Sequence, residues 1–143
     1  MPVAMLVEVV TMLPTGWLRK LFGDRGERAA VRYLRRHGFQ ILARQARSRL
    51  GEIDIIATEG DWVVFVEVKT RTSTVKGHPV EAVTPDKQRQ LTRAALAWLK
   101  HRGWLERRCR FDVIAVTWRP GQQPVIEHFP AAFEARGTDS LYS

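Results

Sequence analysis

The stretch at residues 51–69 reads GEIDIIATEGDWVVFVEVK and decides the fold of this chain. Apolar and polar residues alternate on both sides of Gly60-Asp61, and Ile and Val are enriched on both arms, which is the pattern of a β-hairpin. With Gly60-Asp61 as a two-residue turn, Asp54 lies opposite Glu67 and Glu52 lies opposite Lys69. Strand side chains alternate with period two, so these four side chains are expected on one face.

Two opposed carboxylates are unusual in a hairpin. Directly opposed residues have Cβ atoms about 4.5 to 5.5 Å apart, and like charges placed there are destabilising. A divalent metal between Asp54 and Glu67 would offset the repulsion, and a nearby Lys or a raised carboxylate pKa would do so more weakly. A three-residue turn would instead place Ile53 or Ile55 opposite Glu67, so the prediction depends on the length of the turn. The other face is wholly apolar and is expected to be core; it carries Ile53, Ile55, Ala57, Val64, Val66 and Val68.

Composition indicates a basic globular protein. The chain has 143 residues, enough for one domain with a real core. Its 23 Lys and Arg outnumber 15 Asp and Glu, and the net charge of +8 points to a polyanionic partner. Nucleic acid is the commonest such partner and the one we expect; a membrane surface is disfavoured because no basic amphipathic helix stands apart from the rest.

The ends of the chain differ in character from its middle. The first residues, MPVAMLVEVVTMLP, form an apolar run that is broken by Glu8 and Pro14 and is not preceded by basic residues, so they resemble neither a signal peptide nor a membrane span. We expect an N-terminal extension at residues 1–22, one domain at 23–136 and a flexible tail at 137–143. The single Cys109 excludes an internal disulfide and suits a cytoplasmic location.

Periodicity and capping signals predict the remaining elements. A helix is expected from Asp24, as N-cap, to His37, followed by a strand at residues 39–47 and then the hairpin. After a loop at 71–83, Thr84-Pro85 opens a second helix that ends near Arg102. Strands follow at 110–118, apolar on both faces and so central, and at 123–129, as an edge. The order αβββαββ predicts an α/β sandwich in which helices flank a central mixed β-sheet.

The helices carry polar residues toward the sheet. Glu27 lies on the apolar stripe of the first helix, near its positive N-terminal end, so its carboxylate is expected to approach the hairpin. Lys87 and Gln88, at the open end of the second helix, lean the same way. Arg89 and Arg93 lie on a basic face of that helix.

The hairpin has the residues of a phosphodiester-hydrolysis site. Carboxylate and carbonyl oxygens are preferred ligands of Mg²⁺, and Asp54, Glu67 and the carbonyl of Val68 supply them. Lys69, two residues after Glu67, has an ammonium that would position a water or stabilise charge on a phosphate. The alternative is that Lys69 merely pairs with Glu52 and that Asp54 is solvated.

These residues also form a recognisable pattern. Asp54 with Glu67-Val68-Lys69 has the form of the PD-(D/E)xK nuclease signature, although Ile53 stands where the signature has Pro. Five blocks in order resemble the YraN family of small bacterial proteins, predicted endonucleases related to archaeal Holliday junction resolvases: GERAAVRYLRRHGFQILARQ, GEIDIIA, VFVEVKTR, VTPDKQRQL and CRFDVIAV.

The resemblance implies a restriction-endonuclease-like fold and an endonuclease that uses Mg²⁺, or Mn²⁺, on branched or otherwise irregular DNA. Asp54 and Glu67 would hold the metal, and Lys69 and Glu27 would complete the catalytic set. A junction resolvase needs two sites, so a homodimer would be required. The residues expected to contact nucleic acid are Arg71, Lys87, Gln88, Arg89 and Arg93.

Other readings remain open. The chain is alternatively a nucleic-acid-binding or assembly module that kept the fold without turnover. Asp112 is expected to form a structural ion pair with Arg110, and the four histidines have no metal-ligand spacing. Arg44 and Arg47 belong to either a solvated basic surface or a phosphate track. The tryptophans, Trp62, Trp98, Trp104 and Trp118, are expected in the core or at its rim rather than as base-stacking platforms.

Overall fold

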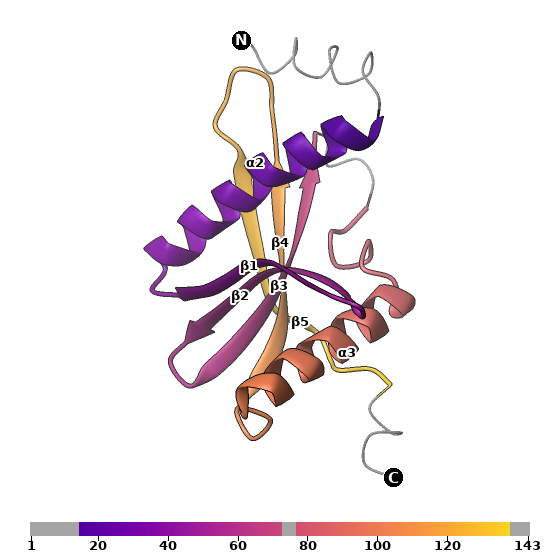
Figure 1. Cartoon of the computed structure of the whole chain (residues 1–143). Coiled ribbons are helices and arrows are strands. Elements are labelled where there is room, and N and C mark those ends of the chain that lie inside the picture. Colours follow the sequence, from indigo (N-terminus) through magenta and orange to yellow (C-terminus); the bar gives the residue numbers. More distant parts are fainter. Residues whose placement is uncertain (1–14, 73–76, 138–143) are drawn as a thin grey trace.

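The computed structural model describes residues 15–72 and 77–137, with side chains from residue 21 onward except residue 22. It has the predicted order of helix, three strands, helix and two strands (Figure 1). The outer parts of the expected extension and tail, residues 1–14 and 138–143, lie outside the described range. The elements are α2 (Thr15–Arg36), β1 (Gln40–Ser48), β2 (Gly51–Glu59), β3 (Trp62–Arg71), α3 (Pro85–Arg102), β4 (Cys109–Thr117) and β5 (Val125–Phe133).

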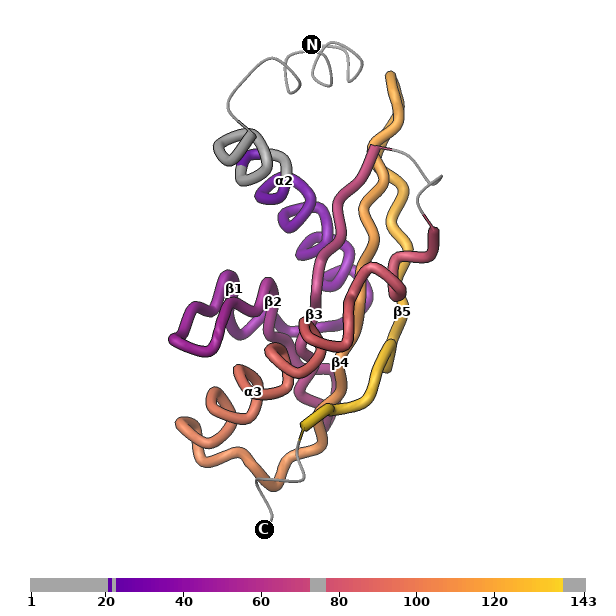
Figure 2. Tube along the Cα trace, turned by 90° about the vertical axis from the view of Figure 1, so that its right-hand side faces the viewer, coloured from indigo at the N-terminus to yellow at the C-terminus, as the bar shows by residue number. Residues whose placement is uncertain are grey.

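The five strands form one mixed sheet in the order β1-β2-β3-β4-β5. Only β3 and β4 are parallel, and the connection between them contains α3, because a parallel pair needs a crossover. The other neighbours are antiparallel. β1 and β2 extend between α2 on one side and α3 on the other (Figure 2). The predicted α/β class, with helices flanking a mixed sheet, is therefore confirmed.

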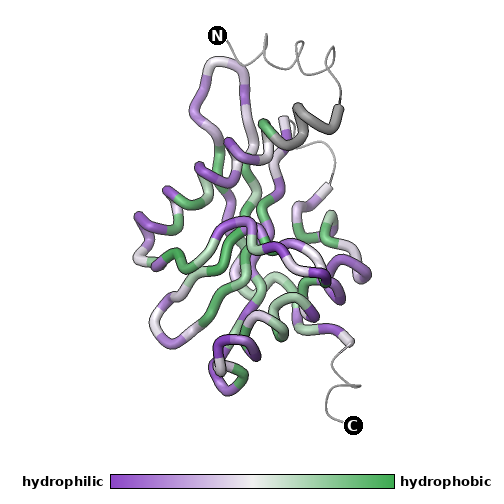
Figure 3. Tube along the Cα trace, in the orientation of Figure 1, coloured by the Kyte–Doolittle hydropathy of each residue, from purple (hydrophilic) through white to green (hydrophobic). Residues whose placement is uncertain are grey.

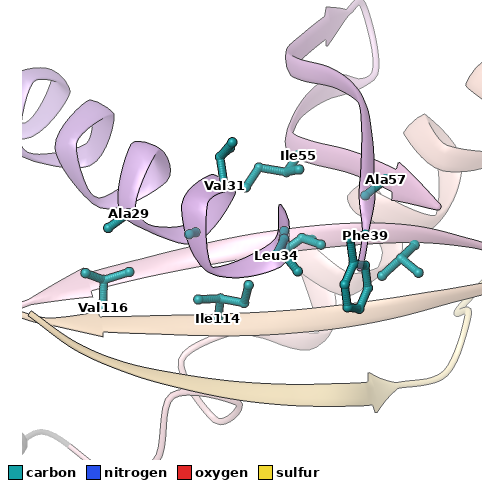
Figure 4. Packing of buried hydrophobic residues seen from close by; sticks show 11 residues of the cluster. Ala29, Val31, Leu34, Phe39, Ile55, Ala57, Ile114 and Val116 are labelled. Atoms are coloured by element: carbon teal, nitrogen blue, oxygen red, sulfur yellow. The ribbon is translucent and has the colours of Figure 1, made fainter. Parts of the chain in front are cut away.

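Each helix packs a separate core against one face of the sheet. α2 contributes Val31 and Leu34, which belong to one cluster with strand residues such as Ile55 and Ile114 (Figure 4). The second core lies under α3, with these members among others: Leu91, Ala95, Leu99, Ile56, Val63, Phe65 and Val113. Hydrophobic residues accordingly concentrate along the strands (Figure 3).

The expected common face of Ile53, Ile55 and Ala57 is wrong for Ile53. Ile55 and Ala57 pack under α2, whereas Ile53 joins the core under α3. The side-chain alternation of β2 is interrupted at Asp54. Opposite this point in β1, Gln45 has φ 47°, a bulge-like conformation that bends and twists a strand.

Helix α2 is longer than predicted. It begins at Thr15, so Asp24 lies inside the helix and does not cap it. The Gly-Asp pair at 23–24 resembles a helix start, but the helix continues through Gly23 and Gly26. Gly26 permits a close approach to β3, since a Cβ there would lie 2.1 Å from Oγ1 of Thr70.

Helix α3 has the predicted caps. Oγ1 of Thr84 accepts a hydrogen bond from the backbone N–H of Lys87 at 3.2 Å, and Gly103 forms the left-handed C-cap. The last strand runs farther than expected, from Val125 to Phe133, and is an edge as predicted. Neither helix in the described part of the chain combines the length and apolar character needed to cross a membrane.

Candidate functional site

The hairpin has the predicted register, but its backbone pairing ends before it reaches Asp54 and Glu67. Pairs such as Ile55 with Val66 and Glu59 with Trp62 match a two-residue turn, in which Gly60 has φ 56°. Ile55 and Val66 are the last backbone pair. Beyond them, Oδ2 of Asp54 accepts a hydrogen bond from the backbone N–H of Val68 at 2.8 Å, so a side chain replaces the next rung of the ladder.

Asp54 and Glu67 meet at this point, and each changes the ionisation of the other. Burial first, and then the negative charge of Glu67, raise the pKa of Asp54 to about 7. Burial also raises the pKa of Glu67, although the positive charges of Lys87 and Lys69 and a hydrogen bond with Asp54 act in the opposite direction. Two carboxyl groups this close titrate as a pair, and a proton or cation shared between them relieves their repulsion.

Two lysines supply positive charge beside the pair. Nζ of Lys69 lies 3.7 Å from Oε1 of Glu67, and the charge of Lys87, in the first turn of α3, acts on both carboxyl groups. Oε2 of Glu67 is buried and has no hydrogen-bond partner among the residues that the structure describes. The site therefore retains an unsatisfied acceptor despite its neighbouring lysines.

The alternative in which Lys69 merely pairs with Glu52 is wrong. Oε2 of Glu52 instead accepts a hydrogen bond from Nε of Arg47 at 3.1 Å. The backbone ladder does not extend to these residues, so Lys69 is free to turn toward Glu67. Lys69 thus belongs to the acidic pair, and Asp54 is partly buried rather than solvated.

Glu27 approaches from α2, as the stripe on that helix predicts. It is only 5% exposed and lines the same pocket, of about 230 Å³, as Asp54. Its negative charge contributes to the raised pKa of Asp54, after burial and the charge of Glu67. Because α2 begins at Thr15, Glu27 is mid-helix and not near the positive end, so the expected stabilisation by the helix N-terminus is wrong.

Two β1 residues hold Glu27 instead. Nε of Arg44 donates to Oε1 at 3.2 Å, and Nε2 of Gln45 donates to Oε2 at 3.3 Å and also to Oδ1 of Asp24 at 2.8 Å. For Arg44 the sequence left the role open, and for Gln45 it carried no signal. The role of Gln45 becomes visible in the structure, where this residue lies opposite Asp54 with a bulge-like backbone conformation.

The basic residues expected near the start of α3 lie in different surroundings. Lys87 is partly buried beside the carboxyl pair. Arg89 forms an ion pair with Asp86 one turn earlier, and Arg93 is exposed on the outer face of the helix. Lys87 is therefore the member of this group that the fold brings to the acidic pair.

Gln88 and Arg71 make contacts within the protein. Gln88 is 8% exposed; its Nε2 donates to the carbonyl of Val83 at 3.0 Å, and its Oε1 accepts from Arg136. Arg71 donates to the carbonyl of Gly77 at 2.7 Å. Gln88 thus anchors the loop before α3 and the segment after β5, and it does not join the carboxyl pair.

The donor set fits a hard divalent cation held by two carboxylates. Mg²⁺ usually binds through one or two carboxylates and keeps several waters. Asp54 and Glu67 are adjacent, both have raised pKa values, and no hydrogen-bond donor from the described part of the chain reaches Oε2 of Glu67. Within residues 15–72 and 77–137, no three His, Cys, Asp or Glu side chains come together as a larger metal-binding group.

A second polar cluster has a structural character. Asp112 is fully buried, and it accepts hydrogen bonds from Arg110 at 3.0 Å, His128 at 2.7 Å and the N–H of Ala131 at 3.0 Å. The expected Arg110–Asp112 ion pair is confirmed. Burial raises the pKa of the Cys109 thiol, so this cysteine is not an activated nucleophile.

The part of the chain that carries these elements is similar to known proteins. The model of a family described as "Uncharacterised protein family UPF0102" matches residues 26–116, which include Glu27, the hairpin and α3. A UPF0102 protein of Geobacter metallireducens is 55% identical over 115 residues, covering 80% of this chain and 93% of the relative. UPF0102 proteins of Geobacter sulfurreducens and Rhodococcus jostii are each 51% identical, over 80% and 78% of this chain and 90% and 94% of the relatives. The chain belongs to the UPF0102 family.

Proposed function

We propose that this protein is a Mg²⁺-dependent endonuclease that hydrolyses phosphodiester bonds in DNA. The observation that carries the proposal is the pair formed by Asp54 and Glu67, which are adjacent and disfavour simultaneous ionisation. Within the described ranges, Oε2 of Glu67 is also without a donor. A purely structural carboxyl pair would be expected to have its acceptors satisfied. A divalent cation satisfies them and removes the repulsion.

Each residue has a distinct role in this reaction. Asp54 and Glu67 would hold the cation, for which Mn²⁺ is a second candidate. Bound there, the cation would polarise a phosphoryl oxygen and lower the pKa of a bound water. Lys69, close to Glu67, would stabilise the charge that develops on the phosphate, and Lys87 would contact a neighbouring phosphate from the first turn of α3.

Glu27 acts at the edge of the site. Arg44 and Gln45 fix its carboxylate, so it is positioned without being free to turn toward a lysine. In the pocket that it shares with Asp54, it would accept a hydrogen bond from a water near the phosphate. The preference for branched or irregular DNA, and the dimer that a junction resolvase requires, rest on the family resemblance.

The deciding experiment is a cleavage assay on linear, nicked, flapped and four-way DNA with Mg²⁺, Mn²⁺ or EDTA. Wild type should cleave at least one substrate only with metal, and Glu67→Gln should abolish cleavage because a neutral amide is a poor Mg²⁺ ligand. Glu127→Gln, which removes an exposed charge on the edge strand, is the matched control and should cleave normally.

Stability and binding measurements complete this test. Glu67→Gln should be as stable as wild type without metal, or more so, and should still bind DNA, since it removes one of two repelling charges. If wild type binds DNA but cleaves none of these substrates, and gains no stability from Mg²⁺, the alternative of a non-catalytic binding module replaces the proposal.

A further inference from the structure

A second surface, made of arginine and tryptophan side chains, lies at the C-terminal end of α3. There the α3–β4 connection meets the β2–β3 turn (Figure 1). The backbone N–H of Val63 donates to the carbonyl of Arg108 at 2.8 Å, which ties the two segments together. We call this region the basic-aromatic surface; it consists of Trp62, Trp98, Arg102, Trp104, Arg107 and Arg108.

Arginines lie over indole rings throughout this surface. The guanidinium carbon of Arg107 is 3.8 Å from the centroid of the Trp104 ring, and that of Arg102 is 4.5 Å from Trp98 and 5.4 Å from Trp104. Arg108 lies 5.8 Å from Trp62. The two indoles Trp98 and Trp104 pack edge to face at 5.7 Å, so they form one rigid base for the arginines.

The arginines are left available for an anion. Arg102, Arg107 and Arg108 are exposed, and in the described part of the chain none of them has an ion-pair partner. Stacking fixes the plane of a guanidinium while its N–H edge stays free to bind a phosphate. A cation near a helix C-terminus is ordinary, which accounts for Arg102, but Arg107 and Arg108 follow the end of the helix.

The surface also presents an accessible aromatic ring. Trp62 is 36% exposed at the start of β3, and Leu105, 53% exposed, lies in the neighbouring connection. Trp98 and Trp104 are partly buried under arginines. The expectation that the tryptophans occupy the core or its rim therefore describes Trp98 and Trp104 better than Trp62.

We propose that the basic-aromatic surface binds single-stranded nucleic acid, with Arg102, Arg107 and Arg108 on phosphates and Trp62 stacked on an unpaired base. Exposed aromatic rings interleaved with basic side chains are the usual means of binding single strands. Bases in a duplex are already stacked and paired, so an indole on the protein surface gains nothing from them. An anionic membrane is a poorer fit, because among the described residues at this end of α3 only Trp62 and Leu105 are large exposed hydrophobic side chains.

The position of the surface relates it to the carboxyl pair. Lys87 beside the pair and Arg102 on the surface occupy the two ends of α3, and a helical rise of 1.5 Å per residue places them about 22 Å apart. A nucleic acid bound at both sites would therefore have an unpaired, single-stranded segment on the basic-aromatic surface, about 22 Å from the bond that is cleaved. This second step rests on the proposed function, whereas single-strand binding does not.

The test is equilibrium binding in EDTA, followed by fluorescence polarisation of a labelled oligo(dT) of about 15 nucleotides, a length within the usual site sizes. Trp62→Ala should weaken binding about tenfold, whereas Trp62→Phe should retain most of it. Arg107→Gln with Arg108→Gln should reduce the slope of log affinity against log salt by about 1.4, since each single-strand phosphate contact contributes about 0.7.

The matched control is Arg35→Gln with Arg36→Gln, which removes the same charge from exposed positions at the end of α2. It should change both quantities much less than the double variant on the surface. Equal losses in the two double variants would mean that net charge alone binds the strand, and would overturn the proposal. Trp62→Ala with unchanged affinity would overturn it as well.

Competitors distinguish other partners. Blunt duplex, phosphatidylserine vesicles and poly-glutamate should each displace oligo(dT) poorly; displacement by vesicles or poly-glutamate at equal charge would replace the proposal with a membrane or acidic-protein partner. The proposed cleavage requires a metal ion, so a binding assay in EDTA is independent of the proposed function. A protein that binds oligo(dT) through this surface and cleaves nothing would support the surface and refute the endonuclease.

Discussion

Replacing Asp54 with Asn should stabilise the metal-free protein above neutral pH. In the fold, burial and the charge of Glu67 hold the pKa of Asp54 at about 7, against an ordinary value of 3.8. Asn has the same shape and its side-chain oxygen can still accept the hydrogen bond from the N–H of Val68. The variant therefore removes a disfavoured charge without removing the contact that ends the hairpin.

The difference between the two pKa values sets the magnitude. At about 1.36 kcal/mol for each pKa unit, ionising Asp54 costs the fold about 4 kcal/mol at pH 8. Some of this cost is relieved when Glu67 takes the shared proton, so we expect Asp54→Asn to raise the free energy of unfolding by on the order of 1 to 3 kcal/mol. For a domain of this size that corresponds to a rise in Tm of at least about 3 °C.

The pH dependence has a defined sign. Between the two pKa values the folded protein binds more protons than the unfolded chain, so wild-type stability should fall as the pH rises from about 4 to 7. The stabilisation by Asp54→Asn should be small near pH 4, grow through this interval and level off above pH 7. Mg²⁺ should stabilise wild type, by about 2.7 kcal/mol at a hundredfold excess over Kd, and leave the variant unchanged, so the advantage of the variant should disappear or be reversed.

Thermal unfolding in EDTA and in Mg²⁺, at several pH values, measures both effects. Asp61→Asn is the control, because Asp61 is an exposed acid in the hairpin turn and its replacement should change Tm little. A lower Tm for Asp54→Asn at pH 8 in EDTA would refute the reasoning, because Asp54 would then be a stabilising structural charge.

Three further predictions concern the surroundings of the site. Arg89→Gln with Arg93→Gln should flatten the salt dependence of duplex DNA binding by about 0.9 for each arginine that contacts a phosphate, and an unchanged slope would remove this face of α3 from the binding surface. Gly26→Ala should lower the free energy of unfolding by about 1 to 3 kcal/mol, because its Cβ would collide with Thr70, and Thr70→Ala should restore part of the loss in urea denaturation. Asp112→Asn should cost about 3 to 5 kcal/mol in the same assay, since it leaves buried partners without their charge; a loss below about 1 kcal/mol would contradict that role.

Local signals in the sequence were sufficient for the order of the elements and for the register of the hairpin. Turn chemistry at Gly60-Asp61 and alternation on both arms predict that Asp54 and Glu67 face each other. The structure has that register as far as Ile55 and Val66, and the two carboxyl groups interact just beyond this last backbone pair. Thr84 and Gly103 likewise specify both ends of α3. These features depend on residues close in the chain, which is why they can be predicted without knowledge of the fold.

Local signals misled at two places. Gly23 and Asp24 resemble a helix start, yet α2 passes through them because packing on the sheet, with Gly26 against Thr70, outweighs the low helix propensity of glycine. Ile53 continues the alternation of the strand in sequence, yet it turns to the other core beside the bulge-like Gln45. Both outcomes come from contacts between elements.

The amino-acid sequence by itself determined which side chains are candidates for the site: two carboxylates and a lysine on one hairpin, and a glutamate on the inner stripe of a helix. The tertiary structure alone decided their partners. Lys87 comes to the carboxyl pair because α3 crosses back over the sheet, and Glu27 is held by Arg44 and Gln45 because β1 lies beside β2. The physical reason is that hydrogen bonding and alternation act between neighbours in the chain, whereas burial and charge depend on which distant elements the fold brings together.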